Sequence, residues 1–297
     1  MMRRERRARA RPTGERSAPM KHILTIVHIT LHEAGRRRVL TATLIGAAAF
    51  LTLYGVGLYF VAKNVTADAS LSLVRQRMAL NFLTLAGLYV AHFLALMTAV
   101  LLPVDTLSGD IASGVVQTVA TKPVRRSSIV IGKWLAFSLV AVGYYMMVAV
   151  GVLVIARVIG HFTPPGVAVG LPLMALEAVV LVSLSIAGGA RLATVTNGVL
   201  VFGLYGLAFI GTWVEQIGAM VGNTAARNVG TVASLLMPTE ALWQRAAYFM
   251  QPAIMRDLHM TPFSPASLPS PAMVWWAAGY ALVALALGVR AFAKRAL

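Results

Sequence analysis

Two ionisable side chains, His92 and Glu177, fall inside long apolar stretches of the sequence. A charged side chain at the middle of a bilayer costs about 2.5–3.5 kcal/mol, so such residues mark substrate contacts, proton transfer or hydrogen bonds between helices. We expect His92 to be neutral and hydrogen-bonded between helices. For Glu177, a partly hydrated carboxyl near the outer interface and a contact with substrate both remain open. A proton relay through the pair is disfavoured.

Other familiar site chemistries lack the residues they need. The chain contains no cysteine, which excludes disulfides, thiolate metal sites and cysteine nucleophiles. His28 and His32 stand four residues apart without a third ligand, so contact with lipid headgroups is favoured over a metal site. Gly132 and Lys133 are followed by Trp134 rather than Ser or Thr, and the upstream glycine of a phosphate-binding loop is missing. The sequence therefore predicts neither a metal site nor an ATP site on this chain.

The composition identifies the elements that must position these residues. Of the 297 residues, 58% are hydrophobic and 12% are charged, and the mean hydropathy is +0.76. Soluble domains carry about 25% charged residues, whereas runs of about 20 apolar residues are typical of membrane-spanning helices. We predict an all-α membrane protein with six transmembrane helices, at residues 39–62, 80–102, 134–156, 171–190, 198–214 and 272–289.

The N-terminal part holds two different segments. Residues 1–20 carry seven arginines and no apolar run, which predicts a disordered basic tail, and Met20 is a candidate for the true initiator. Residues 21–38 repeat apolar side chains at steps of three and four, which predicts an amphipathic helix in the membrane interface. The six-span domain is predicted to occupy residues 21–297.

The formal charge of +16 lies mostly on one side of the predicted spans. With the N-terminus inside, the inner segments hold 19 of the 26 Lys and Arg residues, and the outer segments hold seven. Because basic residues are retained on the cytoplasmic side, both termini are predicted to be cytoplasmic. The same asymmetry explains the charge without a nucleic-acid partner.

The inner loop between the second and third spans, residues 103–133, is predicted to contain a short helix. Ser108 is expected to cap this helix, with Asp110 in its first turn and Pro123 ending it. Its apolar stripe consists of Ile111, Val115 and Val119. The alternative for this loop is a solvated connector that carries positive-inside charge.

Two further stretches outside the spans are expected to hold structure. A second inner helix is expected to start at Ser127 or Ser128 and to run into the third span. The outer loop, residues 215–271, mixes amphipathic pieces with a Pro- and Ser-rich stretch before the last span.

Three short motifs in the inner loop resemble the cytoplasmic loop of ABC-2 type permeases. Residues 108–114 read Ser-Gly-Asp-Ile-x-Ser-Gly, residues 121–126 read Thr-Lys-Pro-Val-x-Arg, and Gly132 and Lys133 open the third span. Residues 33–38 also resemble the Glu-x-x-Arg-x-Arg end of that family's N-terminal elbow helix. The last eight residues resemble its C-terminal tail, with Ala296 in place of the family's aspartate.

The resemblance implies the permease subunit of an ATP-driven exporter. It implies an elbow helix with Glu33, Arg36 and Arg38, and a cytoplasmic coupling helix that docks ATP-binding subunits. The docking residues it implies are Asp105, Ser108, Gly109, Asp110, Gly114, Thr121, Lys122, Pro123, Arg126 and Lys133.

The same resemblance implies the partners and the location of the chain. Two ATP-binding subunits would hold ATP and Mg²⁺, while this chain would bind no cofactor of its own. A second copy or a homologous permease would complete the cargo path, surrounded by membrane lipids. The location implied is a bacterial or archaeal plasma membrane.

Two other function classes remain as alternatives. A membrane-embedded enzyme or assembly factor would use His92, Glu177 and the outer loop, and it requires these polar groups to converge on one cavity. A proton-coupled carrier requires the same convergence together with pH-driven uptake. The sequence does not identify the cargo.

Overall fold

The computed structural model describes residues 19–67, 72–114, 125–257 and 267–294. Within these ranges the regular secondary structure is α-helical, and six helices are long and apolar enough to cross a membrane. This confirms the predicted all-α fold with six spans. The six helices are α2 (Arg38–Ala67), α3 (Leu73–Leu101), α6 (Arg126–Gly160), α7 (Val167–Gly189), α8 (Thr194–Met220) and α12 (Pro271–Ala293).

The helices are longer than the apolar runs that predict them. The third predicted span covers residues 134–156, whereas α6 begins at Arg126 and ends at Gly160. An apolar run measures only the part of a helix that suits hydrocarbon, and backbone hydrogen bonding continues into the polar interface. Local signals then set some ends: Ser72 accepts a hydrogen bond from the Arg75 backbone N–H at the start of α3, and Pro271 opens α12.

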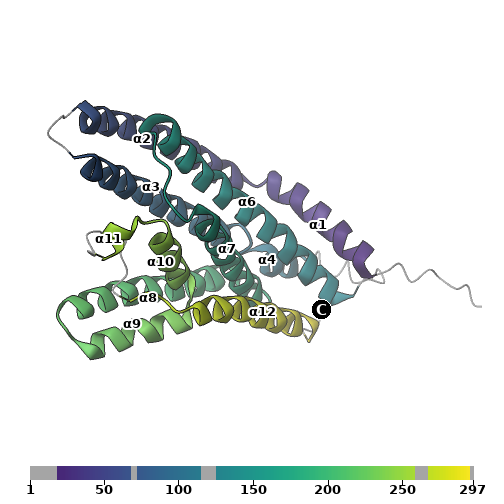
Figure 1. Cartoon of the computed structure of the whole chain (residues 1–297). Helices are drawn as coiled ribbons and strands as arrows, with labels where there is room; N and C mark the ends of the chain where they lie inside the picture. The colour runs from purple at the N-terminus through teal and green to yellow at the C-terminus, as the bar shows by residue number, and fades with distance from the viewer. Residues whose placement is uncertain (1–18, 68–71, 115–124, 258–266, 295–297) are drawn as a thin grey trace, which may run out of the picture.

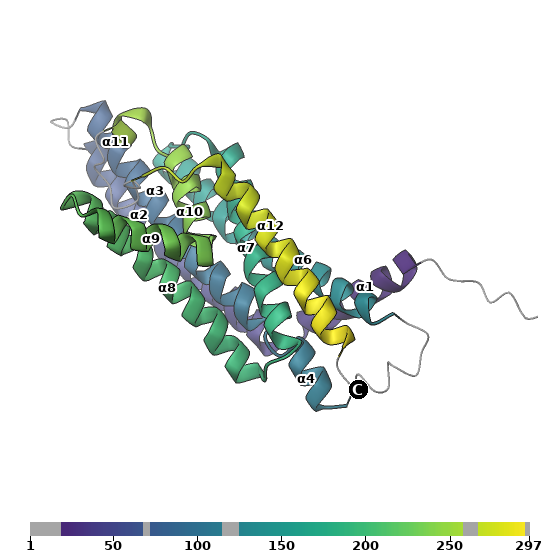
Figure 2. The same cartoon turned by 90° about the horizontal axis from the view of Figure 1, so that it is seen from below.

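The helices form one bundle with two different ends (Figure 1). The first helix, α1 (Pro19–Gly35), packs along the first part of α6, and the short α4 (Thr106–Ala112) lies near the same end, as does the end of α12 (Figure 2). The end of α2, the start of α3, the α8–α9 connection and α11 (Ala253–Asp257) lie at the opposite end. The helix α7 is central, because it packs against α3, α6, α8, α10 and α12.

The predicted outer loop folds back among the spans. After α8 the chain reverses, and α9 (Thr224–Leu236) runs antiparallel along α8. Glycines allow this approach, since a Cβ on Gly230 would lie 2.3 Å from the Glu215 Cβ and 2.7 Å from the Gly211 carbonyl oxygen. The next helix, α10 (Thr239–Phe249), is buried against α7. The two helices differ, because α10 buries Leu242 and Trp243, whereas α9 packs on α8 through Gly230 and Ser234 and leaves Val229 and Val232 exposed.

The short inner helix differs from its prediction. It begins at Thr106, with Asp105 at the N-cap position and no capping side-chain hydrogen bond, so the expected Ser108 cap is wrong. It ends after Ala112, where Gly114 adopts a left-handed conformation with φ of 73°. The remaining members of the predicted loop helix lie outside the described residues: Val115, Val119, Thr121, Lys122 and Pro123.

Candidate functional site

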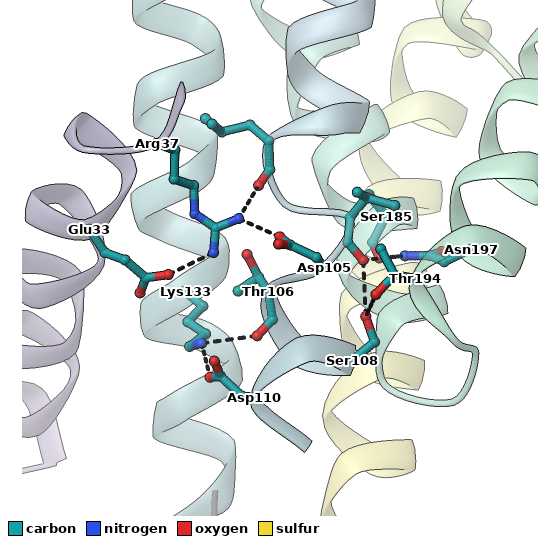
Figure 3. A network of polar contacts seen from close by, with 12 residues as sticks. Glu33, Arg37, Asp105, Thr106, Ser108, Asp110, Lys133, Ser185, Thr194 and Asn197 are labelled. Carbon is teal, nitrogen blue, oxygen red and sulfur yellow. Dashed lines mark hydrogen bonds and ion pairs between the residues drawn. The ribbon is translucent and has the colours of Figure 1, made fainter. Parts of the chain in front are cut away.

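A single guanidinium, that of Arg37, joins four helix ends at the end of the bundle that holds α1 and α4. Arg37 lies in the link between α1 and α2 and donates to Glu33 Oε1 at 2.6 Å and to the Leu102 carbonyl oxygen at 3.2 Å (Figure 3). It also forms an ion pair with Asp105, just before α4, and its cationic group lies 5.8 Å from the centre of the Phe137 ring of α6. Burial lowers the pKa of Arg37, but the hydrogen bonds to Glu33 and Asp105 outweigh it and raise that pKa above its ordinary value. Arg37 therefore stays charged.

The side chain of Lys133 fixes α4 to α6. Lys133 is only 7% exposed, and its Nζ donates to the Thr106 carbonyl oxygen at 3.2 Å and pairs with Asp110. The preceding Gly132 lets α1 approach, because a Cβ there would lie 2.7 Å from Ile26 Cγ2. The Gly-Lys pair at the entry to the third span therefore brings α1 and α4 onto the same helix.

Hydrogen bonds on the other side of α4 tie it to α7 and α8. The Ser108 hydroxyl lies 2.8 Å from the Thr194 hydroxyl at the start of α8 (Figure 3). The Asn197 side-chain amide donates to the Val104 carbonyl oxygen at 3.2 Å and to the Ser185 carbonyl oxygen at 2.8 Å. We call these contacts, together with those of Arg37 and Lys133, the inner polar network. Through it, α4 is connected to α1, α6, α7 and α8.

Part of the α4 surface is open with respect to the described residues. Asp105, Gly109 and Ser113 follow one another at steps of four residues, which places them on one helix face. The Asp105 side chain is 47% exposed, and Ser113 is exposed. A Cβ added at Gly109 would meet nothing closer than the Asp105 Cβ at 3.9 Å. This face is the part of α4 that a partner protein can reach.

A second polar cluster is buried among the spans. His92 Nδ1 lies 2.9 Å and 3.0 Å from the two carboxylate oxygens of Glu177 on α7, and its Nε2 lies 3.4 Å from Glu240 Oε1 on α10. The Tyr145 hydroxyl donates to Glu177 at 3.2 Å, and the Tyr205 hydroxyl donates to Glu240 at 2.6 Å. His92, Glu177 and Glu240 are 0%, 1% and 2% exposed. We call these five residues the buried acid–histidine cluster.

Comparison with protein families decides what kind of protein carries these features. The family model described as ABC-2 family transporter protein matches residues 27–297. The chain belongs to this family. It is therefore a multi-pass membrane component of an ABC transporter, and the family implies association with ATP-binding subunits. A search of curated proteins finds no match.

Several residues that the sequence assigned to docking in this permease lie together. Asp105, Ser108, Asp110 and Lys133 belong to the inner polar network, and Gly109 lies on the open face of α4. Gly114 lies just after α4, where it ends the helix. Arg126 lies apart from them, and its guanidinium donates to the Ala293 carbonyl oxygen of α12 at 3.1 Å.

The N-terminal arginines of the permease differ in their contacts. Arg36 and Arg38 are exposed, whereas the intervening Arg37 makes the contacts of the inner polar network. Sequence reasoning missed Arg37, although a signal was present. Glu33 and Arg37 are four residues apart, which is the spacing of an ion pair along a helix.

The structure also joins the two ionisable residues that the sequence treated separately. Glu177 pairs with His92 and is 1% exposed, which differs from the expectation of a partly hydrated carboxyl. Sequence reasoning missed Glu240, Tyr145 and Tyr205. Only the apolar residues around Glu240, in Ala-Leu-Trp, gave a weak signal of burial.

The geometry of the buried acid–histidine cluster limits its chemistry. Its two carboxylates lie at opposite nitrogens of the His92 ring, so the three side chains do not face one common metal position. Among the described residues, no group of three or more His, Cys, Asp or Glu side chains has metal-binding geometry. The enzyme alternative requires these polar groups to converge on a cavity, whereas the carboxyl groups of Glu177 and Glu240 are directed at the His92 ring itself. The arrangement suits proton binding and helix-to-helix contact.

Proposed function

We propose that this chain is the permease subunit of an ATP-driven exporter and that partner ATP-binding subunits act on α4. The observation that carries this proposal is the inner polar network, which ties α4 to four other helices while one face of α4 stays open. A force applied to that open face is transmitted to spans through these contacts. The solvated-connector alternative gives no reason for a loop held from both sides.

The strength of the contacts supports movement of α4 and α6 as one body. Removing one partner from a buried ion pair costs about 3–5 kcal/mol, because the other charge is left without compensation. The Lys133–Asp110 pair comes close to this case on the Lys133 side, whereas the Asp110 side chain is 26% exposed, which lowers the cost. Separating α4 from α6 would break these contacts, so a force on α4 is expected to move α6 with it.

The energy for transport comes from the partners in this proposal. ATP binding favours one state of the assembly over another, and docking on α4 passes that preference to the spans. Two partner subunits hold ATP and Mg²⁺, and a second copy of this chain or a homologous permease completes the cargo path at their seam. The distribution of Lys and Arg supports cytoplasmic termini in a bacterial or archaeal plasma membrane.

The decisive experiment places a bulky side chain on the open face of α4. The Gly109→Trp variant should keep membrane insertion, because among the described residues an added Cβ meets only the Asp105 Cβ at 3.9 Å, and it should lose permease-stimulated ATP turnover by the co-purified P-loop ATPase. Gly114 is a poorer position, since its left-handed backbone strains any larger residue.

The matched control is Gly143→Trp on α6. Gly143 is exposed, has no atom within 4 Å of an added Cβ, and lies among the exposed apolar residues Leu139, Met147 and Val150. This variant should retain stimulated ATP turnover. If Gly109→Trp also retains it, α4 is not the docking element.

A further inference from the structure

The docking proposal does not use the buried acid–histidine cluster. Its members come from five helices: His92 from α3, Tyr145 from α6, Glu177 from α7, Tyr205 from α8 and Glu240 from α10. Five of the packed helices therefore meet at one imidazole ring. Because α10 lies in the segment between α8 and α12, the His92–Glu240 contact joins an element of the predicted outer loop to the spans (Figure 1).

The hydrogen-bond donors around His92 favour an additional bound proton in this cluster. A neutral imidazole has one N–H and one lone pair, whereas an imidazolium has two N–H donors. Both ring nitrogens of His92 face carboxylates, at 2.9 Å from Glu177 and 3.4 Å from Glu240. With a neutral ring, one lone pair would oppose an ionised carboxylate. The Tyr205 hydroxyl lies 3.2 Å from Nε2, but it has one hydrogen and donates it to Glu240 at 2.6 Å. A proton added to His92 or to the opposing carboxyl satisfies both contacts.

The charge around this proton favours its retention. Among the described residues, Glu177 and Glu240 form ion pairs with His92 and with no Lys or Arg. Two buried carboxylates with a neutral ring would carry two uncompensated charges, which is costly away from water. The other titratable groups facing His92 are hydroxyls of Tyr145 and Tyr205 and the ring of Tyr89, which stacks on it at 5.7 Å. They contribute no positive charge.

Access to the proton requires helices to separate. The three ionisable members are at most 2% exposed, so water does not reach them in this conformation. α10 has 11 residues, far fewer than the spans around it. Separating α10 from α3 breaks the His92–Glu240 contact and opens one side of the ring. The spans stay packed along the rest of their length.

We propose that His92, Glu177 and Glu240 form a proton-binding site that holds α10 closed against the spans. The bound proton favours the closed position, and its loss leaves two carboxylates that repel each other across a neutral ring. Because the closed form binds more protons than the open form, raising the pH favours release of α10. The opening of the permease at its outer end is thus linked to proton release, and this inference needs no partner subunit.

The test uses the full chain in phosphatidylcholine nanodiscs without an ATPase. The Trp243 ring lies 5.1 Å from the His92 ring, and a protonated imidazole in contact with an indole quenches its fluorescence. The chain has five tryptophans, so the Trp243 signal is taken as the difference between the unmodified chain and Trp243→Phe. We expect this difference signal to rise in a single transition as the pH increases.

Two substitutions assign that transition. The His92→Gln variant should lose it, whereas the control His28→Gln, at an exposed position of α1, should retain it. A Trp243 signal that is constant with pH, or a transition that survives in His92→Gln, overturns the proposal.

A measurement on the unmodified chain covers the case in which these variants fail to fold. Hydrogen exchange of α10, corrected for the intrinsic pH dependence of amide exchange, should accelerate by about tenfold per pH unit within the transition if one proton is linked to closure. Exchange of α9 serves as the reference within the same molecule. Equal pH dependence of α9 and α10 contradicts proton-linked release. A failed docking experiment leaves this result unaffected.

Discussion

At the scale of single residues, the contacts of Arg37 predict that replacing it loosens the inner end of the bundle. Arg37→Ala leaves Asp105 and the Leu102 carbonyl oxygen without their donor, and we expect it to lower the free energy of unfolding by about 1–3 kcal/mol. The exposed neighbour provides the control: Arg36→Ala should change stability by less than about 0.5 kcal/mol. Thermal unfolding in detergent measures both. Equal effects would mean that the Arg37 contacts contribute nothing specific.

The same residues show that the sequence predicts local ion pairs but not pairs between distant segments. The Glu33–Arg37 pair was readable, because four-residue spacing is a local property of a helix. Arg37 and Asp105 are 68 positions apart, and His92 and Glu240 are 148 positions apart. An isolated polar residue in an apolar run indicates that a partner exists, but nothing local to it says which partner. The sequence therefore identified His92 and Glu177 of the buried acid–histidine cluster but not the other members.

At the scale of elements, Gly132 predicts how α1 is held. A Cβ there would lie 2.7 Å from Ile26 Cγ2 and 3.2 Å from the Ile23 carbonyl oxygen, so Gly132→Leu should push α1 off α6 and cost about 1–3 kcal/mol. Gly143→Leu, at an open position of the same helix, should be tolerated. Limited proteolysis of α1 reports the displacement. Adding Ile26→Ala to Gly132→Leu should restore part of the protection, and no recovery would argue against this contact.

The predictions of the helices were right or wrong for physical reasons that the structure identifies. The six spans were predicted because hydrocarbon selects long apolar runs directly. The predicted start of α4 at Ser108 is wrong, because the Ser108 hydroxyl hydrogen-bonds to Thr194 of α8 instead of capping α4. The fold-back of α9 depends on Gly211 and Gly230 facing each other, and a glycine in the sequence does not say what approaches it.

At the scale of the whole molecule, the two polar regions share the same helices. α6 carries Lys133 of the inner polar network and Tyr145 of the buried acid–histidine cluster, and α8 carries Asn197 and Tyr205 in the same two roles. A displacement that starts at α4 therefore acts on helices that also hold α10. The proposed ATP-driven step and the proposed proton-linked step would therefore move the same helices, α6 and α8.

The orientation of the whole molecule is the last prediction, and the cysteine-free sequence makes it directly measurable. Single cysteines are introduced at two exposed positions near opposite ends: Ser113→Cys after α4, and Ala225→Cys at the start of α9. With both termini cytoplasmic, a membrane-impermeant maleimide should label Ala225→Cys in intact cells and Ser113→Cys only after permeabilisation. Both variants leave the charge distribution unchanged. The reverse pattern would place α4 outside, where no ATP-binding subunit can reach it, and would remove the docking proposal together with the predicted topology.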